Sequence, residues 1–166
     1  DGVAIKGGKG PWADDYVKNP GNGPSTDVLI EDCTFASPTH HALTLGSECP
    51  AATNIVMRNC KMAGCGCVLY LKMRTDTPQH YSDVLVENCT GKSGVFFQAM
   101  GWSQYHDAKG RSAQEVFSYA DNIKLRNNVI KARRRFRVNK NPKVWQIKNL
   151  ILENNIINGK EAKIDL

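Results

Sequence analysis

A segment pattern of about eight residues occurs five times in this chain, and it limits the possible folds more than any other feature. Each copy opens with Asp or Asn, continues through mostly apolar residues to a charged residue, and closes with Asp or Asn. The copies cover residues 27–34, 54–61, 83–90, 122–129 and 149–156, with starts 27, 29, 39 and 27 residues apart. Short segments of this kind predict strands that enter tight turns, because Asn and Asp side chains tolerate the bend.

A second predicted strand follows each of the first three copies. Alternating apolar residues place Val3, Leu43, Leu69 and Val95 in one inward column, and Ile5, Leu45, Leu71 and Phe97 in the next. Phe136 and Val138 continue these columns one coil later. Two strands per repeat of 26 to 29 residues, without helical periodicity, predict an all-β chain. Such coils bury a continuous core only by stacking, so we expect a parallel β-helix (solenoid) of about five coils, forming one domain over residues 1–166.

The cysteines follow the same repeat. Five residues fall at equivalent places and are expected to stack along the coils: Cys33, Cys60, Cys89, Asn128 and Asn155. Because cysteine is small and readily buried, a structural role for this stack is favoured over a redox role. The Cys65-Gly-Cys67 spacing does not fit the paired CxxC pattern of a zinc site. We therefore expect no metal and no cofactor.

Two segments interrupt the period, at about 7–26 and 100–121, and are predicted to be irregular loops. Long loops of this kind are often functional, although variable decoration explains them almost as well. The net charge of +6 favours a polyanionic partner, which charge alone leaves open as nucleic acid, an anionic membrane or an acidic polysaccharide. No apolar run approaches the roughly 18 residues of a membrane span, and residues 1–5 do not resemble a signal peptide.

Candidate site residues converge on one face of the predicted coils. Asp1 precedes Val3 by two residues and His41 precedes Leu43 by two, so they are expected at the same place on adjacent coils. Neighbouring strands lie about 4.8 Å apart, within interaction range. On the following coil the outward positions hold Tyr70, Lys72 and Arg74. From spacing alone, a solvated polar face explains these residues as well as a binding site does.

Three ordered motifs resemble the polygalacturonase-type glycoside hydrolases. The segment from Asp1 to Gly7, Asp-Gly-Val-Ala-Ile-Lys-Gly, is similar to the second half of their Asp-Asp-x-x-Ala-Ile-Lys motif. His41 to Glu48 resembles their Gly-His-Gly-x-x-x-Gly-Ser-x segment, and Tyr70-Leu-Lys72 stands where that family usually has Arg-Ile-Lys. The resemblance implies a right-handed parallel β-helix and a pectin-degrading enzyme that cleaves galacturonan-type bonds by inversion.

The resemblance also implies individual roles. Asp1 matches a water-activating carboxylate, His41 a histidine that tunes the catalytic acid, and Lys72 a lysine that binds the uronate carboxylate. The family's general acid and a further Asp would lie before residue 1. The chain is therefore expected to be a C-terminal part, truncated at its N-terminal side and inactive or nearly so by itself. Such a truncated end would expose a strand edge and favour self-association.

Position 70 departs from the family pattern, because tyrosine cannot replace the charged fork of arginine. Arg74 is predicted to point outward like Tyr70 and is a candidate to supply the missing charge. If it does not, the resemblance implies a different pectic substrate, such as a rhamnogalacturonan or a substituted galacturonan. Arg135 and Arg137 have the same parity and are candidates to bind acidic sugars further along. Nucleic acid is not expected as a partner, because no aromatic and basic platform accompanies the charge.

Two other functions remain open. One is a non-catalytic β-helix that binds acidic polysaccharide through Lys72, Arg74 and the arginine cluster. The other is a uronate lyase or epimerase, for which calcium dependence would be the sign. For the hydrolase, pectin or galacturonan is the expected partner, no membrane partner is expected, and a secreted or periplasmic location follows only from the inferred substrate.

Overall fold

A computed structural model describes residues 1–8, 23–101 and 110–164 of the chain. The regular structure of this part consists of strands that belong to two sheets. The part of the chain that is described has no helix long and apolar enough to cross a membrane. The chain is therefore all-β over the described residues, as the repeat predicted.

The first sheet has the strand order β1-β4-β6-β8-β10-β13-β14, and β3 also pairs with β6. Its strands are β1 (Val3–Ile5), β3 (Thr34–Phe35), β4 (Leu43–Leu45), β6 (Lys61–Met73), β8 (Thr90–Gly101), β10 (Val129–Val138), β13 (Ile156–Ile157) and β14 (Lys160–Glu161). The pairings are parallel except for the antiparallel pair β13–β14.

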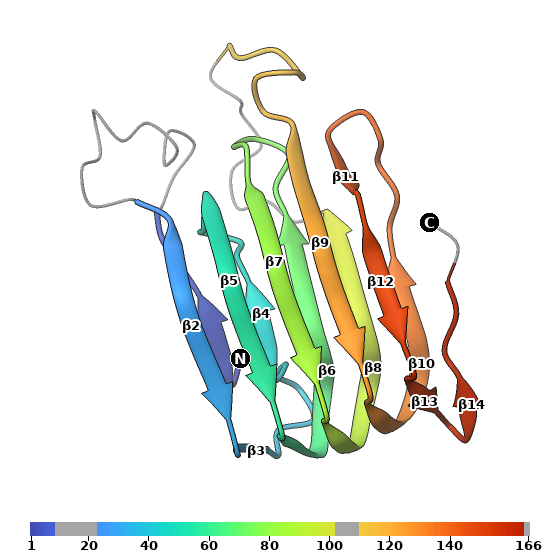
Figure 1. The fold of residues 1–166 in the computed structure, drawn as a ribbon. Coiled ribbons are helices and arrows are strands. Elements are labelled where there is room, and N and C mark those ends of the chain that lie inside the picture. Colours follow the sequence, from blue (N-terminus) through green and yellow to red (C-terminus); the bar gives the residue numbers. More distant parts are fainter. Residues whose placement is uncertain (9–22, 102–109, 165–166) are drawn as a thin grey trace.

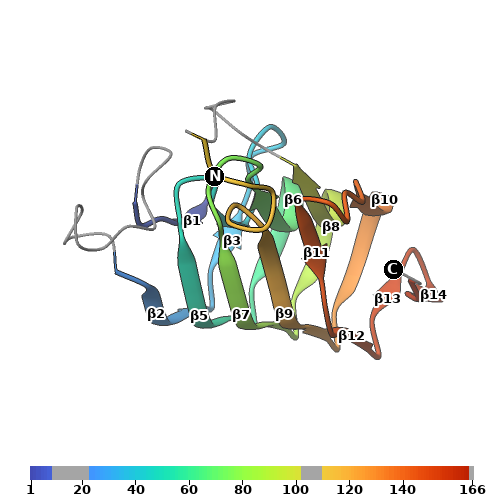
Figure 2. The same ribbon diagram turned by 90° about the horizontal axis from the view of Figure 1, so that it is seen from above.

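The second sheet has the order β11-β9-β7-β5-β2, and β12 also pairs with β9. Its strands are β2 (Ser25–Glu31), β5 (Ala51–Arg58), β7 (His80–Glu87), β9 (Ser118–Arg126), β11 (Trp145–Ile147) and β12 (Leu150–Glu153). From β5 to β10 the chain passes alternately from one sheet to the other. Figure 1 shows the two sheets as layers, and Figure 2 shows β1 and β2 at one end of the stack and β13 and β14 at the other.

The five sequence repeats form β2, β5, β7, β9 and β12, in the predicted register. Val28, Ile55, Val84, Ile123 and Leu150 are paired from strand to strand. The closing residues of the five repeats all have φ between 53° and 56°: Asp32, Asn59, Asn88, Asn127 and Asn154. This left-handed region is one that Asn and Asp adopt more readily than most residues. The prediction that these residues make the turns is confirmed.

The inward columns of the first sheet are confirmed as far as β6 but not in β8. Leu69 pairs with Leu43 on one side and with Phe97, rather than Val95, on the other. Leu71 correspondingly pairs with Ala99 rather than Phe97. The predicted register was therefore wrong by two residues. A shift of two keeps every side chain on the same face, so the apolar alternation cannot detect it.

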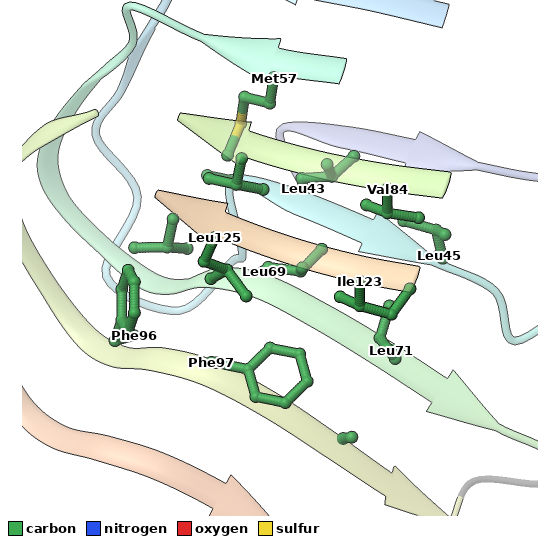
Figure 3. Packing of buried hydrophobic residues seen from close by; sticks show 14 of the residues in the cluster. Leu43, Leu45, Met57, Leu69, Leu71, Val84, Phe96, Phe97, Ile123 and Leu125 are labelled. Carbon is green, nitrogen blue, oxygen red and sulfur yellow. The ribbon is translucent and has the colours of Figure 1, made fainter. Parts of the chain in front are cut away.

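The core lies between the two sheets and runs through all the coils. Figure 3 shows leucine and phenylalanine side chains of β4, β6 and β8 meeting apolar side chains of β5, β7 and β9. Leu69, Phe97, Ile55, Ile123 and Leu125 are each fully buried. Phe136 and Val138 continue the columns in β10, as predicted, and are partly buried. The core fixes which alternate residues of the first sheet point outward.

The cysteine and asparagine stack is also present. The Cys89 backbone N–H donates to Asn128 Oδ1 at 2.9 Å, and Asn128 Nδ2 donates to Asn155 Oδ1 at 2.8 Å. All six cysteines of the chain are free thiols, and only Cys33 is exposed. Burial raises the pKa of the Cys89 thiol to about 12, which agrees with a structural role.

Residues 9–22 of the first predicted loop, 7–26, and residues 102–109 of the second, 100–121, lie outside the described residues. The described parts show that regular structure extends further than predicted. Strand β2 begins at Ser25, β8 ends at Gly101, and β9 begins at Ser118.

Candidate functional site

Asp1 and His41 occupy equivalent places on adjacent coils, as predicted from their spacing. Val3 pairs with Leu43 in parallel register, and the backbone N–H of Gly2 donates to the His41 carbonyl oxygen at 2.7 Å. Both site residues therefore immediately precede strands of the first sheet. Their placement depends on the inward anchors of β1 and β4 rather than on loop conformation.

Lys72, one coil further along, reaches back to Asp1. Its Nζ lies 3.3 Å from Asp1 Oδ2, and the side chains of Lys72 and Asp1 are 14% and 17% exposed. Burial lowers the pKa of Lys72 from its ordinary value, the nearby charge of Lys6 lowers it further, and Glu48 partly offsets both. A poorly hydrated ammonium beside a carboxylate is a suitable contact for a second carboxylate, such as that of a uronic acid.

Tyr70 joins the histidine to the lysine. Its ring meets the His41 ring edge to face, with centroids 4.9 Å apart and planes at 86°. Lys72 Nζ lies 5.4 Å from the centroid of the same ring, in cation–π range. Tyr70 is only 4% exposed, and burial raises the pKa of its phenol. The neutral ring of Tyr70 therefore packs against the His41 ring and the Lys72 ammonium, and very little of it is accessible to solvent.

His41 is held in its neutral form. Burial lowers its pKa from 6.5 to about 4, and the charge of Lys72 is the second cause. Its Nδ1 atom is buried and has no hydrogen-bond partner within the described residues. The hydroxyl of Thr44, which pairs with Tyr70 in the neighbouring strand, is in the same situation. Two polar groups of the site thus have hydrogen-bonding capacity that the described part of the chain does not use.

Lys6 and Glu48 complete the charged surroundings, and the prediction of the site did not include them. Lys6 Nζ lies 3.6 Å from Glu48 Oε2, and both residues act on the pKa of Lys72. They stand in the motifs around Asp1 and His41, so their position next to the site was accessible from the sequence.

Gln98 was missed for a different reason. In the observed register it pairs with Tyr70, and its side chain counteracts part of the rise that burial causes in the pKa of the Tyr70 phenol. The predicted register placed Phe96 opposite Tyr70. The two-residue shift in β8 therefore hid a member of the site.

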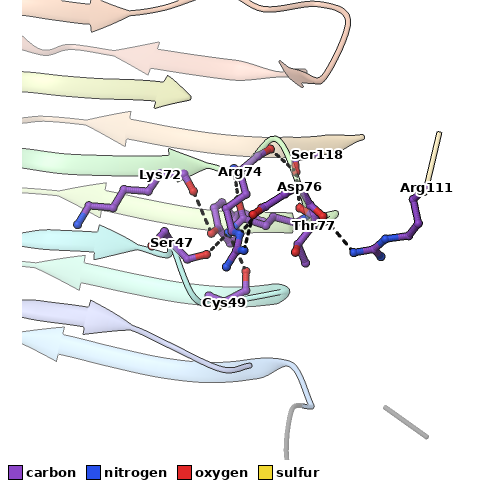
Figure 4. Close-up of polar contacts among 10 residues, drawn as sticks. Ser47, Cys49, Lys72, Arg74, Asp76, Thr77, Arg111 and Ser118 are labelled. Atoms are coloured by element: carbon purple, nitrogen blue, oxygen red, sulfur yellow. Dashed lines mark hydrogen bonds and ion pairs between the residues drawn. The ribbon is translucent and has the colours of Figure 1, made fainter. Parts of the chain in front are cut away.

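Arg74 does not lie in the site as predicted. Its side chain is 1% exposed and forms a double ion pair with Asp76, with Nε to Oδ1 at 2.7 Å and Nη2 to Oδ2 at 2.9 Å. The Ser118 hydroxyl donates to the carbonyl oxygen of Arg74 at 3.3 Å, and the Arg74 backbone N–H donates to Gln79 Oε1. Figure 4 shows this network at the end of β6, beyond Lys72. Buried in this way, the guanidinium is not presented to a ligand, and we do not carry Arg74 forward as a substrate-binding residue.

The arginine cluster of β10 borders the site. Gln98 pairs with Arg137, so Tyr70, Gln98 and Arg137 form one row across β6, β8 and β10. Arg137 is exposed, and among the described residues it forms no ion pair. Its charge lowers the pKa of Tyr70, although burial outweighs that effect. Arg135 is partly buried, and parity places it on the same side of β10.

Neither a family model nor a curated protein matches this chain. In the described part of the chain, no three His, Cys, Asp or Glu side chains come together as a potential metal site. The residues and their geometry alone therefore have to support a function.

Proposed function

We propose that the chain is a right-handed parallel β-helix and forms part of a polygalacturonase-type glycoside hydrolase. Parallel strands that alternate between two sheets support the fold. The observation that supports the activity best is the cluster of Asp1, His41 and Lys72, contributed by three successive coils of the first sheet. The resemblance to that family selects the same three residues from the sequence.

The geometry supports a role for each residue. The Asp1 carboxylate activates the attacking water, and Lys72 binds the carboxylate of a uronic acid next to the bond that is cleaved. His41, neutral above about pH 4, offers an unprotonated nitrogen or an N–H group as a hydrogen-bonding partner and does not serve as a cationic acid. Tyr70 packs against the His41 ring and the Lys72 ammonium and holds both in place.

Inversion requires a second carboxyl group about 6.5–9.5 Å from the water-activating one. We propose that coils preceding Asp1 in the complete polypeptide supply it, so that the 166-residue chain alone hydrolyses pectic polymers slowly or not at all. Substrate carboxylate competes with Asp1 for Lys72, which frees Asp1 to accept a proton from water.

The test is the release of reducing ends from polygalacturonate and from rhamnogalacturonan. The 166-residue chain is compared with a natural polypeptide that carries it together with several preceding coils. We expect only the longer protein to cleave, and His41→Ala to reduce its rate at least a hundredfold. His40→Ala is the matched control, because His40 is exposed and bonds locally to Ser37, and it should retain activity. A longer protein that cleaves neither polymer would refute the proposal.

A second candidate is a non-catalytic module that binds acidic polysaccharide, and the exposed arginines of β10 favour it. For this function the same assay shows no cleavage, whereas Lys72→Gln still weakens binding. In either case the substrate is a polymer of cell-wall type, and we propose a secreted or periplasmic location.

Self-association is a further proposal about the isolated chain. In the described part, β1 pairs only with β4 and β2 only with β5, so each has an unpaired outer edge. Such edges recruit other strands. Sedimentation should show concentration-dependent dimers or larger species, and a monomer at high concentration would contradict this.

A further inference from the structure

The outer edge of β10 is paired only at its beginning. Strand β13 pairs with β10 through Val129 and Ile130, and the chain then turns back as β14. Figure 1 shows β13 and β14 beside the start of β10. The second sheet, in contrast, continues past β9 with β11 and β12. Within the described residues, the last coil therefore lacks the strand that would lie beside the second half of β10.

Hydrogen bonds at the start of β10 show which backbone groups face this edge. The N–H of Val129 donates to the Cys89 carbonyl oxygen, so the odd-numbered residues of β10 face β8. Ala132 faces the other way. Its N–H donates to Asn158 Oδ1 at 2.9 Å, and its carbonyl oxygen accepts from Asn158 Nδ2 at 2.8 Å. The Asn158 amide thus takes the place of a peptide group of the next strand.

The backbone beyond Ala132 has no such substitute. The next even-numbered residues of β10 are Arg134, Phe136 and Val138. Because the direction of the N–H and C=O groups alternates along a strand, those of these three residues point to the same outer edge as Ala132. No backbone group of the described residues pairs with them. This stretch is a template for one further strand.

The side chains along this edge are strongly basic. Five of the ten residues of β10 are cations and none is an acid: Lys131, Arg133, Arg134, Arg135 and Arg137. In the part of the chain that is described, none of the five forms an ion pair. A strand of like charge would be repelled at this edge, whereas an acidic strand would gain charge-assisted contacts.

The inward side of the same edge is apolar. Phe136 and Val138 face the core but are only partly buried. Val138 also lines a cavity of about 150 Å³, to which Trp145 and Ile147 of β11 contribute. In a strand added beside β10, the residue opposite Val138 would direct its side chain toward this cavity.

We propose that the free edge of β10 is a docking site for an extended acidic segment of a partner protein, which adds to the first sheet as a further strand. Its backbone pairs with Arg134, Phe136 and Val138. Its acidic side chains lie on the outward side, next to Arg135 and Arg137. Its apolar side chains alternate with them and face inward, next to Phe136 and Val138. The recognised sequence therefore alternates acidic and apolar residues, whichever way the partner strand runs.

A peptide strand fits this edge better than an acidic polysaccharide does. A polysaccharide neutralises arginines, but it has neither the peptide groups that continue a β-ladder nor the alternating apolar side chains. Charged residues also protect free edges against non-specific pairing. Here the same charges that repel a second copy of β10 select an acidic strand. The proposal is independent of the proposed hydrolase, because Asp1, His41 and Lys72 belong to other coils.

The experiment is a fluorescence-anisotropy titration of two labelled peptides with the full 166-residue chain. One peptide alternates Glu with Val, and the other has the same composition with every Glu before every Val. We expect the alternating peptide to bind about tenfold more tightly. Arg137→Gln should weaken its binding by about threefold to tenfold. Lys61→Gln, an equal loss of charge at an exposed position of β6, is the matched control and should leave binding within about twofold.

Amide hydrogen exchange gives a readout that charge alone does not move. The alternating peptide should slow exchange at Arg134, Phe136 and Val138, with little change at the odd-numbered residues of β10, which face β8. Equal binding of the two peptides, or unchanged exchange at those three amides, would overturn the inference. Displacement of the peptide by an oligogalacturonate of equal charge at the same concentration would also overturn it, and would assign the arginines to a polysaccharide.

Discussion

Mild acid should destabilise the chain through His41. Its pKa is about 4 in the folded protein, mainly because of burial and secondly because of Lys72, against an ordinary value of 6.5. As the pH falls below 6.5, the unfolded chain binds a proton at this imidazole that the folded chain does not. The free energy of unfolding must therefore decrease from pH 6.5 downward, and this contribution becomes constant below about pH 4.

The size of the effect follows from the shift. One pKa unit corresponds to about 1.36 kcal/mol, so a drop from 6.5 to about 4 would cost at most about 3.4 kcal/mol. His41 is only half-buried, and solvent screening reduces this figure to roughly 1.5 kcal/mol. That difference still changes the ratio of folded to unfolded chain by about tenfold.

Urea denaturation between pH 8 and pH 4.5 measures this contribution. The parent chain should lose roughly 1.5 kcal/mol more over this range than His41→Gln, which cannot titrate. His40→Gln is the control and should follow the parent, because His40 is exposed. Proton NMR of the imidazole resonances should give a midpoint for His41 below pH 5. A midpoint near 6.5, or parallel stability curves for parent and His41→Gln, would refute the argument that burial keeps His41 neutral.

Three further predictions test the packing between neighbouring strands by urea denaturation. Asn128→Ala should cost about 3 kcal/mol, because it removes three buried side-chain hydrogen bonds; a loss under 1 kcal/mol would contradict this. Gly91→Ala should lower the free energy of unfolding more than Gly64→Ala does. Both glycines have positive φ, but only at position 91 would an added Cβ collide with the backbone of the neighbouring strand. Equal losses would argue against this. Arg74→Met should cost about 3–5 kcal/mol by removing the double ion pair of the buried Asp76 carboxylate with the guanidinium. Adding Asp76→Leu should then restore much of that loss, and no recovery would refute the ion-pair argument.

The strands could be predicted from local sequence because the signal repeats at each turn. Asp32, Asn59 and Asn88 mark their turns through a conformation that few other side chains tolerate. Alternation then assigns inward and outward faces. Register between coils is a different kind of information, because it depends on the exact number of residues between turns.

One extra residue in β6 separates the register at the turn from the register of the columns in β8. The pairing of β6 with β8 is irregular between Ala63 and Cys65, where β6 carries an extra residue, Gly64, with φ of 101°. This bulge displaces the columns that follow it. Glycine at a positive φ is a recognisable bulge signal, but its position among neighbouring small residues gave no unique register.

The sequence predicts those site residues that are placed by the alternation of inward and outward side chains. It does not predict which outward side chains are buried by other segments of the chain. Asp1 and His41 follow from the inward anchors beside them, and these anchors are encoded locally. Arg74 has the same parity as Lys72, yet Asp76 and Ser118 enclose it at the end of β6. Those contacts come from a turn and from a later coil, so no pattern within β6 could reveal them.

The tyrosine at position 70 becomes intelligible when the charges of the site are considered together. An arginine there would stand beside Lys72 and raise the cost of keeping that already poorly hydrated ammonium charged. Tyr70 instead supplies a ring face to the ammonium and an edge to His41 without adding charge. The next outward charge in the same row is then Arg137, two coils away, with the neutral Gln98 between them. On this argument Tyr70→Arg should tighten binding of oligogalacturonate, because it adds a cation at the site, and calorimetry of the parent chain and the variant with that oligosaccharide would show whether it does.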